Sequence, residues 1–206
     1  MNSRLKDNLK YQLKENKLGV ISIAIIIILS LASMLAFLSP YDPNKIDVMN
    51  RLASPSKSHI FGTDDMGRDY FTRALYGGRV SLTVGFLSMI ISTVIGTIVG
   101  TISGYFGGRV DSIIMRTIDI LMSIPTFFLI LIVNAYLKPG IQNIIIIIGL
   151  FSWMGIARIV RAETISVKER EYVMYSKVIG DKPSAIIVNH ITPNIFPTVI
   201  VASTLN

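Results

Sequence analysis

The stretch Arg161–Pro193, RAETISVKEREYVMYSKVIGDKPSAIIVNHITP, is a polar island between two apolar segments of the chain. Ser166 and Glu169 have the S-x-x-E spacing of a capping box, which predicts that a helix begins there. Gly180 is placed to end this helix in a left-handed conformation. The helix is short and half-apolar, so it indicates either a protrusion presented to another protein or an amphipathic loop on the membrane surface. Its apolar members are Val173, Met174, Tyr175, Val178 and Ile179.

The rest of the chain has the composition of a multi-span membrane protein. Of its 206 residues, 51% are hydrophobic and 16% are charged, whereas about a quarter of the residues of a soluble domain are charged. The apolar residues also form long blocks, which is typical of segments that cross a bilayer. We therefore expect an all-α, multi-span helical membrane protein.

Several kinds of chemistry are excluded by what the sequence lacks. There is no cysteine, so a disulfide framework and a thiolate metal site are both excluded. His59 and His190 have no ligand partner at helical spacing, so no metal site is expected. A P-loop, a nucleophile elbow and an H-E-x-x-H motif are also absent, so we expect neither an enzyme nor a cofactor. The net charge is +7, but the basic residues do not alternate with aromatic residues as in RNA-binding motifs. No nucleic-acid partner is therefore expected.

Four full spans and the beginning of a fifth are expected. The apolar blocks cover residues 18–38, 80–103, 120–137 and 141–157, and the fifth begins after Pro193. This last block is too short for a hydrocarbon core that needs about 20 helical residues, so the sequence reads as truncated. Pro125 is expected to bend the third span, and Arg116 and Asp119 are expected to neutralise each other at its entrance.

The distribution of basic residues predicts which ends of the spans are cytoplasmic. Thirteen of the 20 Lys and Arg residues lie in three segments, 1–17, 104–119 and 158–193, and an excess of basic residues marks the cytoplasmic side. Residues 1–17 are therefore read as a cytoplasmic basic N-terminus. The block 18–38 is read as a retained first span rather than a signal peptide, because no small-x-small cleavage site follows it.

Residues 39–79 are expected to form an extracellular loop. Within it, the pattern from Met66 to Tyr76 predicts a short amphipathic helix that rests at the outer membrane interface. Asp64, Asp65 and Asp69 do not have the spacing of an EF-hand, so a calcium loop is not expected.

The second span carries small residues at strict intervals of four. Residues four apart lie on one face of a helix, and small side chains let another backbone approach closely. We therefore predict tight helix packing along this face, with a partner in this chain or in another. The face comprises Ser88, Ser92, Gly96, Gly100 and Gly104.

Two segments resemble the signatures of one transporter family. The island at 161–193 resembles the loop of ABC-importer permeases written EAA, three residues, Gly, nine residues, I-x-L-P, when it is aligned on Gly180 and Pro193. The family's EAA then falls on Met174-Tyr175-Ser176 and its Leu on Thr192, so this chain departs from the pattern there. The run HIFGTDDMGRD, residues 59–69, is similar to the H-x-F-G-T-D-x-x-G-R-D block of the peptide and nickel branch, and its signature residues are Phe61, Gly62, Thr63, Asp64, Gly67, Arg68 and Asp69.

This resemblance implies a membrane subunit of an ATP-driven importer of peptides, nickel or metal chelates in a bacterial cell membrane. The family's fold is the type I importer transmembrane domain with six spans; here that domain covers residues 80–206, with a cytoplasmic coupling loop at 158–193. The implied partners are a second similar permease, two cytoplasmic ATPases, an extracellular substrate-binding protein and membrane lipid. The helix expected at Ser166–Ile179 is implied to sit in a groove of an ATPase. The residues assigned to that contact are Glu171, Tyr172, Met174, Tyr175, Ser176, Gly180 and Asp181.

Two other functions stay open from the residues alone. A secondary transporter or channel is disfavoured because the spans carry no acidic or basic residue at mid-membrane depth. A membrane-anchored scaffold would recruit a soluble partner through the same loop without transport. ATP hydrolysis would reside on separate subunits in the favoured interpretation.

Overall fold

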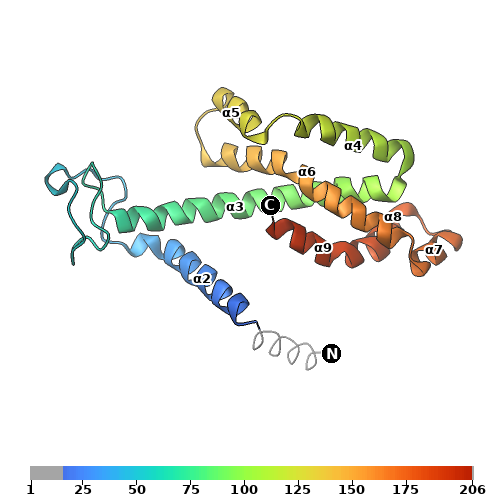
Figure 1. Ribbon diagram of the computed structural model, residues 1–206, viewed down its shortest axis with the longest axis horizontal. Coiled ribbons are helices and arrows are strands. Elements are labelled where there is room, and N and C mark those ends of the chain that lie inside the picture. The colour runs from blue at the N-terminus through green and yellow to red at the C-terminus, as the bar shows by residue number, and fades with distance from the viewer. Residues whose placement is uncertain (1–15, 206) are drawn as a thin grey trace. The chain divides into compact units, whose positions relative to one another are not determined.

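The structure is a computed structural model that describes residues 16–205, and most of the predicted basic N-terminus lies outside this range. The described residues form helices and loops with no extended strand, which confirms the all-α class. The chain divides into two compact units, residues 1–83 and 84–206. The α-helices are α2 (Lys17–Met34), α3 (Tyr70–Phe106), α4 (Gly108–Met122), α5 (Thr126–Tyr136), α6 (Ile141–Lys168), α7 (Glu171–Val178), α8 (Pro183–Ile186) and α9 (Thr192–Thr204), joined by the 3₁₀ turns η1 (Leu35–Leu38) and η2 (Val48–Asn50) and the π-helix η3 (Ile187–Ile191) (Figure 1).

Within residues 16–205, four helical segments are long and apolar enough to cross a membrane, which confirms the multi-span class. A fifth crossing is added if α4 and α5, which meet at an angle of 78°, form one broken span. The four segments are Lys17–Leu38, Tyr70–Phe106, Ile141–Lys168 and Pro183–Thr204.

The helix predicted to begin at Ser166 does not begin there. Helix α6 continues through Ser166 and ends at Lys168, and a separate helix begins at Glu171. The reason is tertiary packing: Thr164 and Val167 are fully buried, so the helix that carries them continues through Ser166 instead of beginning there. The sequence predicted the break between the span ending at residue 157 and the helix beginning at Ser166. In the structure the break between α6 and α7 comprises only residues 169–170.

The third span is broken rather than merely bent. Helix α4 begins at Gly108, well before the predicted start at Ile120, and Pro125 forms the N-terminal boundary of α5. Proline has no N–H for a helical hydrogen bond, which explains the break. Helices α3 and α4 are separated by the single residue Gly107, whose φ of +63° a residue with a Cβ rarely adopts.

Two further boundaries differ from the sequence analysis. The last helical segment begins at Pro183, not after Pro193, and reaches 22 residues. The π-helix η3 lies just before Pro193, where the helix must accommodate a residue without an N–H. The separate interfacial helix expected at Met66–Tyr76 is absent, because α3 starts at Tyr70 and runs unbroken for 37 residues.

The second unit is organised around the contact between α3 and α6. Ser88 of α3 donates a hydrogen bond to the carbonyl of Ile145 (3.2 Å), and Gly104, near the other end of the contact, lies against Thr164. Residue numbers rise together along both helices, so α3 and α6 are parallel. Because parallel neighbours need a returning connection, α4 and α5 carry the chain back along the bundle.

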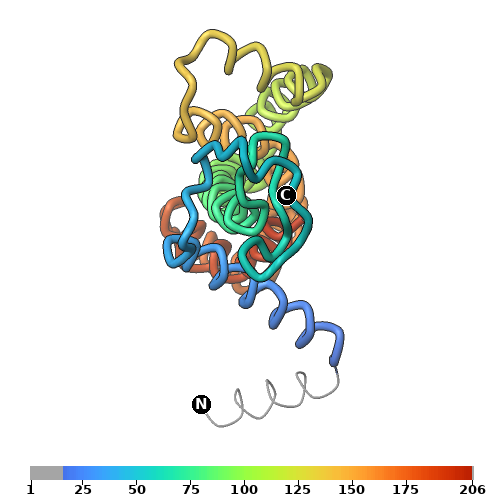
Figure 2. Tube along the Cα trace, turned by 90° about the vertical axis from the view of Figure 1, so that its left-hand side faces the viewer, coloured from blue at the N-terminus to red at the C-terminus, as the bar shows by residue number. Residues whose placement is uncertain are grey.

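The other helices of this unit lie on two sides of α6. Helices α4 and α5 are on one side and α7, α8 and α9 on the other (Figures 1 and 2). On the α9 side, one hydrophobic cluster joins α6, α7, α8, η3 and α9; its buried members are Ile156, Val160, Val167, Val173, Ile186, Ile191, Ile195, Val199 and Ala202. On the α4 side, Ile118, Met154 and Ala157 form a second cluster.

Candidate functional site

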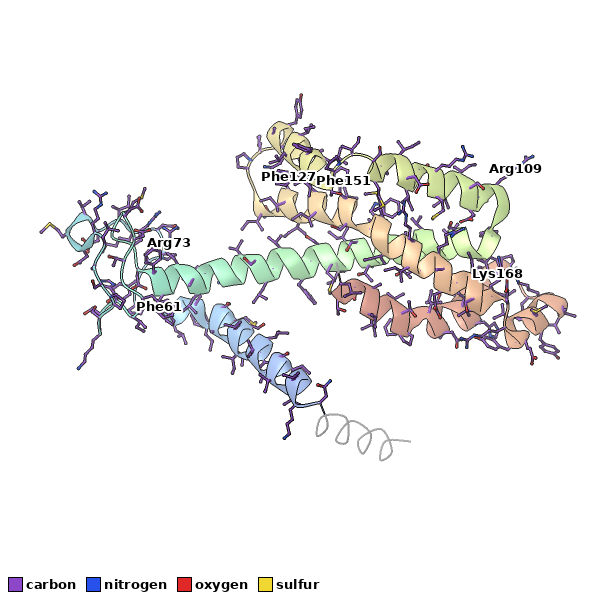
Figure 3. All side chains as sticks on the ribbon, viewed as in Figure 1. Phe61, Arg73, Arg109, Phe127, Phe151 and Lys168 are labelled. Atoms are coloured by element: carbon purple, nitrogen blue, oxygen red, sulfur yellow. The ribbon has the colours of Figure 1, made fainter. Side chains whose placement is uncertain are left out.

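The signature block at residues 59–69 folds into a loop built around the carboxylate of Asp64. This carboxylate accepts hydrogen bonds from the backbone N–H groups of Met66 and Arg68, both at 2.9 Å, and from Nε of Arg68 at 2.7 Å. Arg73, on the first turns of α3, adds an ion pair at 3.2 Å. Figure 3 shows Arg73 and Phe61 in this region. The Phe61 ring packs edge-on against the Phe71 ring, with 5.2 Å between the ring centroids.

The other signature residues fix the helix start and the neighbouring segment. Asp69 caps α3 by accepting from the Thr72 N–H (2.7 Å) and pairs with His59 Nδ1 (2.9 Å). Thr63 accepts from the Ala53 N–H at 2.8 Å. Gly67 has a φ of +77°, and a Cβ there would lie 1.6 Å from the Asp47 carbonyl oxygen. The polar groups of the block thus stabilise the loop itself, which indicates a structural role.

The stability of this loop is expected to depend on pH through its two buried carboxylates. Burial raises the pKa of Asp64, but the Arg68 and Met66 N–H groups and the Arg68 guanidinium lower it more, so the pKa lies below its ordinary value of 3.8. Burial likewise raises the pKa of Asp69, but the hydrogen bonds from the Thr72 N–H and from His59 lower it more. The pKa of Asp69 therefore also lies below its ordinary value. Because both pKa values fall on folding, the stabilisation is complete above the unfolded value and is lost as the pH falls through the folded values.

Proteolysis of the purified protein by pepsin at a series of acidic pH values measures this loss. We expect residues 39–69 to be protected near pH 5 and to be cleaved increasingly below pH 3.8. Asp64→Asn should make cleavage of this loop depend less on pH. Asp65→Asn changes an exposed neighbour and should leave the pH dependence of cleavage unchanged. Equal profiles for the two variants would contradict the role given to Asp64.

The structure brings the predicted stripe of small residues against α6 of the same chain. A Cβ at Gly96 would lie 2.9 Å from the carbonyl oxygen of Trp153, and one at Gly100 would lie 2.5 Å from that of Ala157. A Cβ at Gly104 would lie 2.8 Å from the carbonyl oxygen of Arg161. Ser92, on the same face of α3, is fully buried. The stripe therefore lets two helix backbones approach closely over about 24 Å.

Two ion pairs join α4 to α6, and sequence reasoning missed both. Arg161 binds Asp111 through two contacts of 2.5 Å, and Ser103 of α3 donates to the same carboxylate. Arg158 pairs with Asp119, so the pairing expected between Asp119 and Arg116 is wrong. The partners are separated by 39 and 50 residues in the sequence, and no local spacing signals them.

Helix α7 has one face in the core and one face exposed. Val173 is fully buried in the cluster that contains α6 and α9. Tyr175 and Val178 are 68% and 84% exposed, and Lys177 Nζ lies 5.4 Å from the centre of the Tyr105 ring near the end of α3. Helix α7 is therefore an exposed apolar projection anchored to three other helices.

The end of α7 has the geometry of a Schellman motif. Gly180 has a φ of +91°. The Asp181 N–H donates to the Ser176 carbonyl at 3.1 Å, and the Gly180 N–H donates to the Lys177 carbonyl at 3.2 Å. The left-handed end expected at Gly180 is thus present.

The residues assigned to the coupling contact therefore lie in two different environments. Glu171, Tyr172, Met174, Tyr175, Gly180 and Asp181 are exposed. Ser176 is buried, and its hydroxyl is hydrogen-bonded to Asp181, so Ser176 does not reach the exposed face. Val178 and Ile179 do reach it. The predicted contact omitted these two residues, although their places in the half-apolar pattern could have indicated them.

No metal centre is present among residues 16–205. They contain no group of three or more His or acidic side chains arranged to hold a metal ion. The fold and the site together define a helical, multi-span membrane protein with a structured loop in its first unit and, in its second unit, an apolar helix that projects from the bundle.

Comparison with known proteins identifies the family. A family described as "Binding-protein-dependent transport system inner membrane component" matches residues 96–206. A second, described as "N-terminal TM domain of oligopeptide transport permease C", matches residues 3–55. The chain belongs to the family of inner-membrane components of binding-protein-dependent transport systems, whose members are transport permeases rather than catalysts.

Curated relatives carry names of peptide permeases. The dipeptide transport system permease protein DppC of Bacillus subtilis (strain 168) is 39% identical over 94% of this chain and 61% of the relative. The oligopeptide transport system permease protein OppC of Escherichia coli (strain K12) is 40% identical over 92% of this chain and 64% of the relative. The chain thus spans less than two thirds of the length of these relatives.

Proposed function

We propose that this chain is a permease subunit of an ATP-driven importer of peptides and that α7 couples it to a cytoplasmic ATPase. The names of the relatives favour peptides as the substrate class over nickel or metal chelates. The proposed partners are a second permease that completes the pathway, two ATPases and an extracellular substrate-binding protein. ATP hydrolysis resides on the ATPases in this proposal.

The observation that carries the proposal is the two-sided environment of α7. Its exposed side offers Tyr175 and Val178 to a partner, and an apolar anchor on a rigid helix is the kind of residue that fills a pocket at an interface. Its inner side places Val173 in the same core as α6 and α9. A displacement of α7 by an ATPase would therefore move these helices as a body, which is rigid-body coupling through a packed contact.

The parallel arrangement of α3 and α6 supports the proposed orientation, because it places the ends of both helices on the same side of the membrane. Both helices would run from the extracellular to the cytoplasmic side, so α7, which follows α6, would be cytoplasmic. Arg158, Arg161 and Lys168 at the end of α6 agree with the excess of basic residues expected on that side. The loop at residues 39–69 would then be extracellular and the N-terminus cytoplasmic.

Replacing Val178 with aspartate tests the coupling role. Introducing a carboxylate into an apolar contact should weaken ATPase association by roughly 30-fold, the effect of losing one strong interface residue, and uptake should fall with it. The measurements are co-purification of the ATPase and peptide uptake in cells that express the whole transporter. Met49→Asp is the matched control, because Met49 is also highly exposed and lies on the proposed extracellular loop.

The outcomes separate the alternatives. Loss of both readouts in Val178→Asp alone supports coupling through α7. Uptake that persists without ATP would favour a secondary transporter or channel. ATPase recruitment that changes while uptake stays constant would favour a scaffold.

A further inference from the structure

Helix α4 has an inner face on which every charge is paired. Asp111 and Asp119 are neutralised by Arg161 and Arg158 of α6. Ile118 is fully buried between them in the hydrophobic cluster that contains α6. Nothing on this face is left to attract another charged group.

The outer face of α4 is different. Arg109 and Arg116 are seven residues apart, so they lie on one side of the helix two turns from each other. Among residues 16–205, neither side chain makes an ion pair or a hydrogen bond that would neutralise it. Together with Gly108, Ser112 and Ile113 they line an open hollow of about 520 Å³. Figure 3 shows Arg109 at the start of α4, projecting away from the bundle.

Apolar side chains accompany this pair of arginines. Ile113 lies between them, and Ile120 follows one turn after Arg116; both isoleucines are exposed. Helices α4 and α5 together are also long and apolar enough to cross a membrane as one broken span. A guanidinium on a long apolar stem, beside exposed isoleucine, is suited to the boundary between lipid headgroups and acyl chains.

We propose that this face of α4 binds an anionic phospholipid. The two guanidinium groups would hold the phosphate, because the planar fork of arginine matches its oxygens. The acyl chains would lie along Ile113 and Ile120. Basic pockets on the cytoplasmic side of membrane helices are established sites for anionic headgroups, and the N-terminus of α4 adds a favourable dipole.

The charge and the apolar surroundings together favour a lipid over other anions. Free phosphate would use the arginines but gain nothing from the exposed isoleucines. An acidic surface of another subunit would pair with the arginines, and this alternative is separated by the test below. The proposal concerns lipid binding only, so its failure would leave the transport proposal untouched.

The test measures lipid retention by the full chain. The protein is reconstituted in nanodiscs of phosphatidylcholine with a minor fraction of phosphatidylglycerol, and the lipids retained after release are measured by native mass spectrometry. The variant Arg109→Gln with Arg116→Gln should lower the ratio of retained phosphatidylglycerol to phosphatidylcholine by roughly 25-fold, about fivefold for each basic residue. Inorganic phosphate at millimolar concentration should not displace the lipid.

A matched control removes the same charge elsewhere. Lys45→Gln with Arg51→Gln changes two exposed basic residues of the other unit and should leave the ratio unchanged. If the glutamine variant folds poorly by circular dichroism, Arg109→Lys with Arg116→Lys keeps the charge and should lose only a few-fold, because only the bidentate geometry is removed.

Four results would overturn the proposal. One is an unchanged ratio in the glutamine variant, and another is an equal loss in the control. The third is displacement of the lipid by inorganic phosphate, which would make the hollow a free-phosphate site. Retained phosphatidylglycerol together with lost pairing to the second permease would likewise reject the lipid and identify a protein contact.

Discussion

Replacing Gly100 with valine is expected to destabilise the second unit by roughly 3 kcal/mol, at the upper end of the range for overpacking. Gly100 lies where α3 and α6 approach most closely: its Cβ would meet the Ala157 carbonyl oxygen at 2.5 Å and the Val160 Cβ at 2.9 Å. Both belong to a buried helix, so the clash can be relieved only by separating α3 from α6. SDS-induced unfolding of the purified protein, followed by circular dichroism, measures the effect.

Two glycines of the same helices provide controls. Gly85 on α3 and Gly155 on α6 have no atom within 4 Å of the position that a Cβ would occupy, so their valine variants should change stability by no more than about 0.5 kcal/mol. If Gly85→Val and Gly100→Val unfold alike, close packing along the stripe is not what stabilises the α3–α6 contact. Gly100→Ala should lie between Gly100→Val and the natural chain.

The Arg161→Gln variant should have the second largest effect, about 2–3 kcal/mol. Removing one partner of a fully buried ion pair costs about 3–5 kcal/mol because the remaining charge loses its compensation. The side chains of Asp111 and Arg161 are 17% and 32% exposed, so solvent reduces that cost. The same SDS titration applies.

The neighbouring pair supplies a contrast on the same two helices. Arg158 and Asp119 are 45% and 62% exposed, and exposed pairs contribute at most about 1 kcal/mol. Arg158→Gln should therefore have a small effect. The double variant Arg161→Gln with Asp111→Asn should lose less than the sum of its single variants, because no unpaired carboxylate remains. Equal effects of Arg158→Gln and Arg161→Gln would show that burial does not distinguish the two pairs.

The local sequence was sufficient to predict the backbone conformation where a single residue type restricts it or makes an unusual one accessible. The left-handed end predicted at Gly180 follows from the absence of a Cβ and is present in the structure. Proline lacks the N–H of a helical hydrogen bond, which marked Pro125 as a site of distortion, but the predicted bend is a full break between α4 and α5. The helix boundaries around them were less predictable. Ser166 carries a capping-box pattern, but the burial of Val167 keeps this region within α6, because packing outweighs the small energy of a cap.

The candidate site shows the same division. The exposed apolar residues of α7 were visible in its sequence pattern, whereas the burial of Ser176 depends on how α7 packs against α6 and α9. The spacing of glycines predicted a close contact but left the partner open. Only the fold shows that this partner is α6 and that the two helices run parallel.

By itself, the sequence determined that the chain is an all-α membrane protein, because long apolar blocks can satisfy their backbone groups in lipid as helices. It also predicted the left-handed backbone conformation of Gly180, whereas the positive φ of Gly67 and Gly107 was found only in the structure. The tertiary structure decided which charges meet: Asp111 with Arg161, and Asp119 with Arg158. These partners are far apart in the sequence, and only the packing of α4 on α6 brings them within reach of each other.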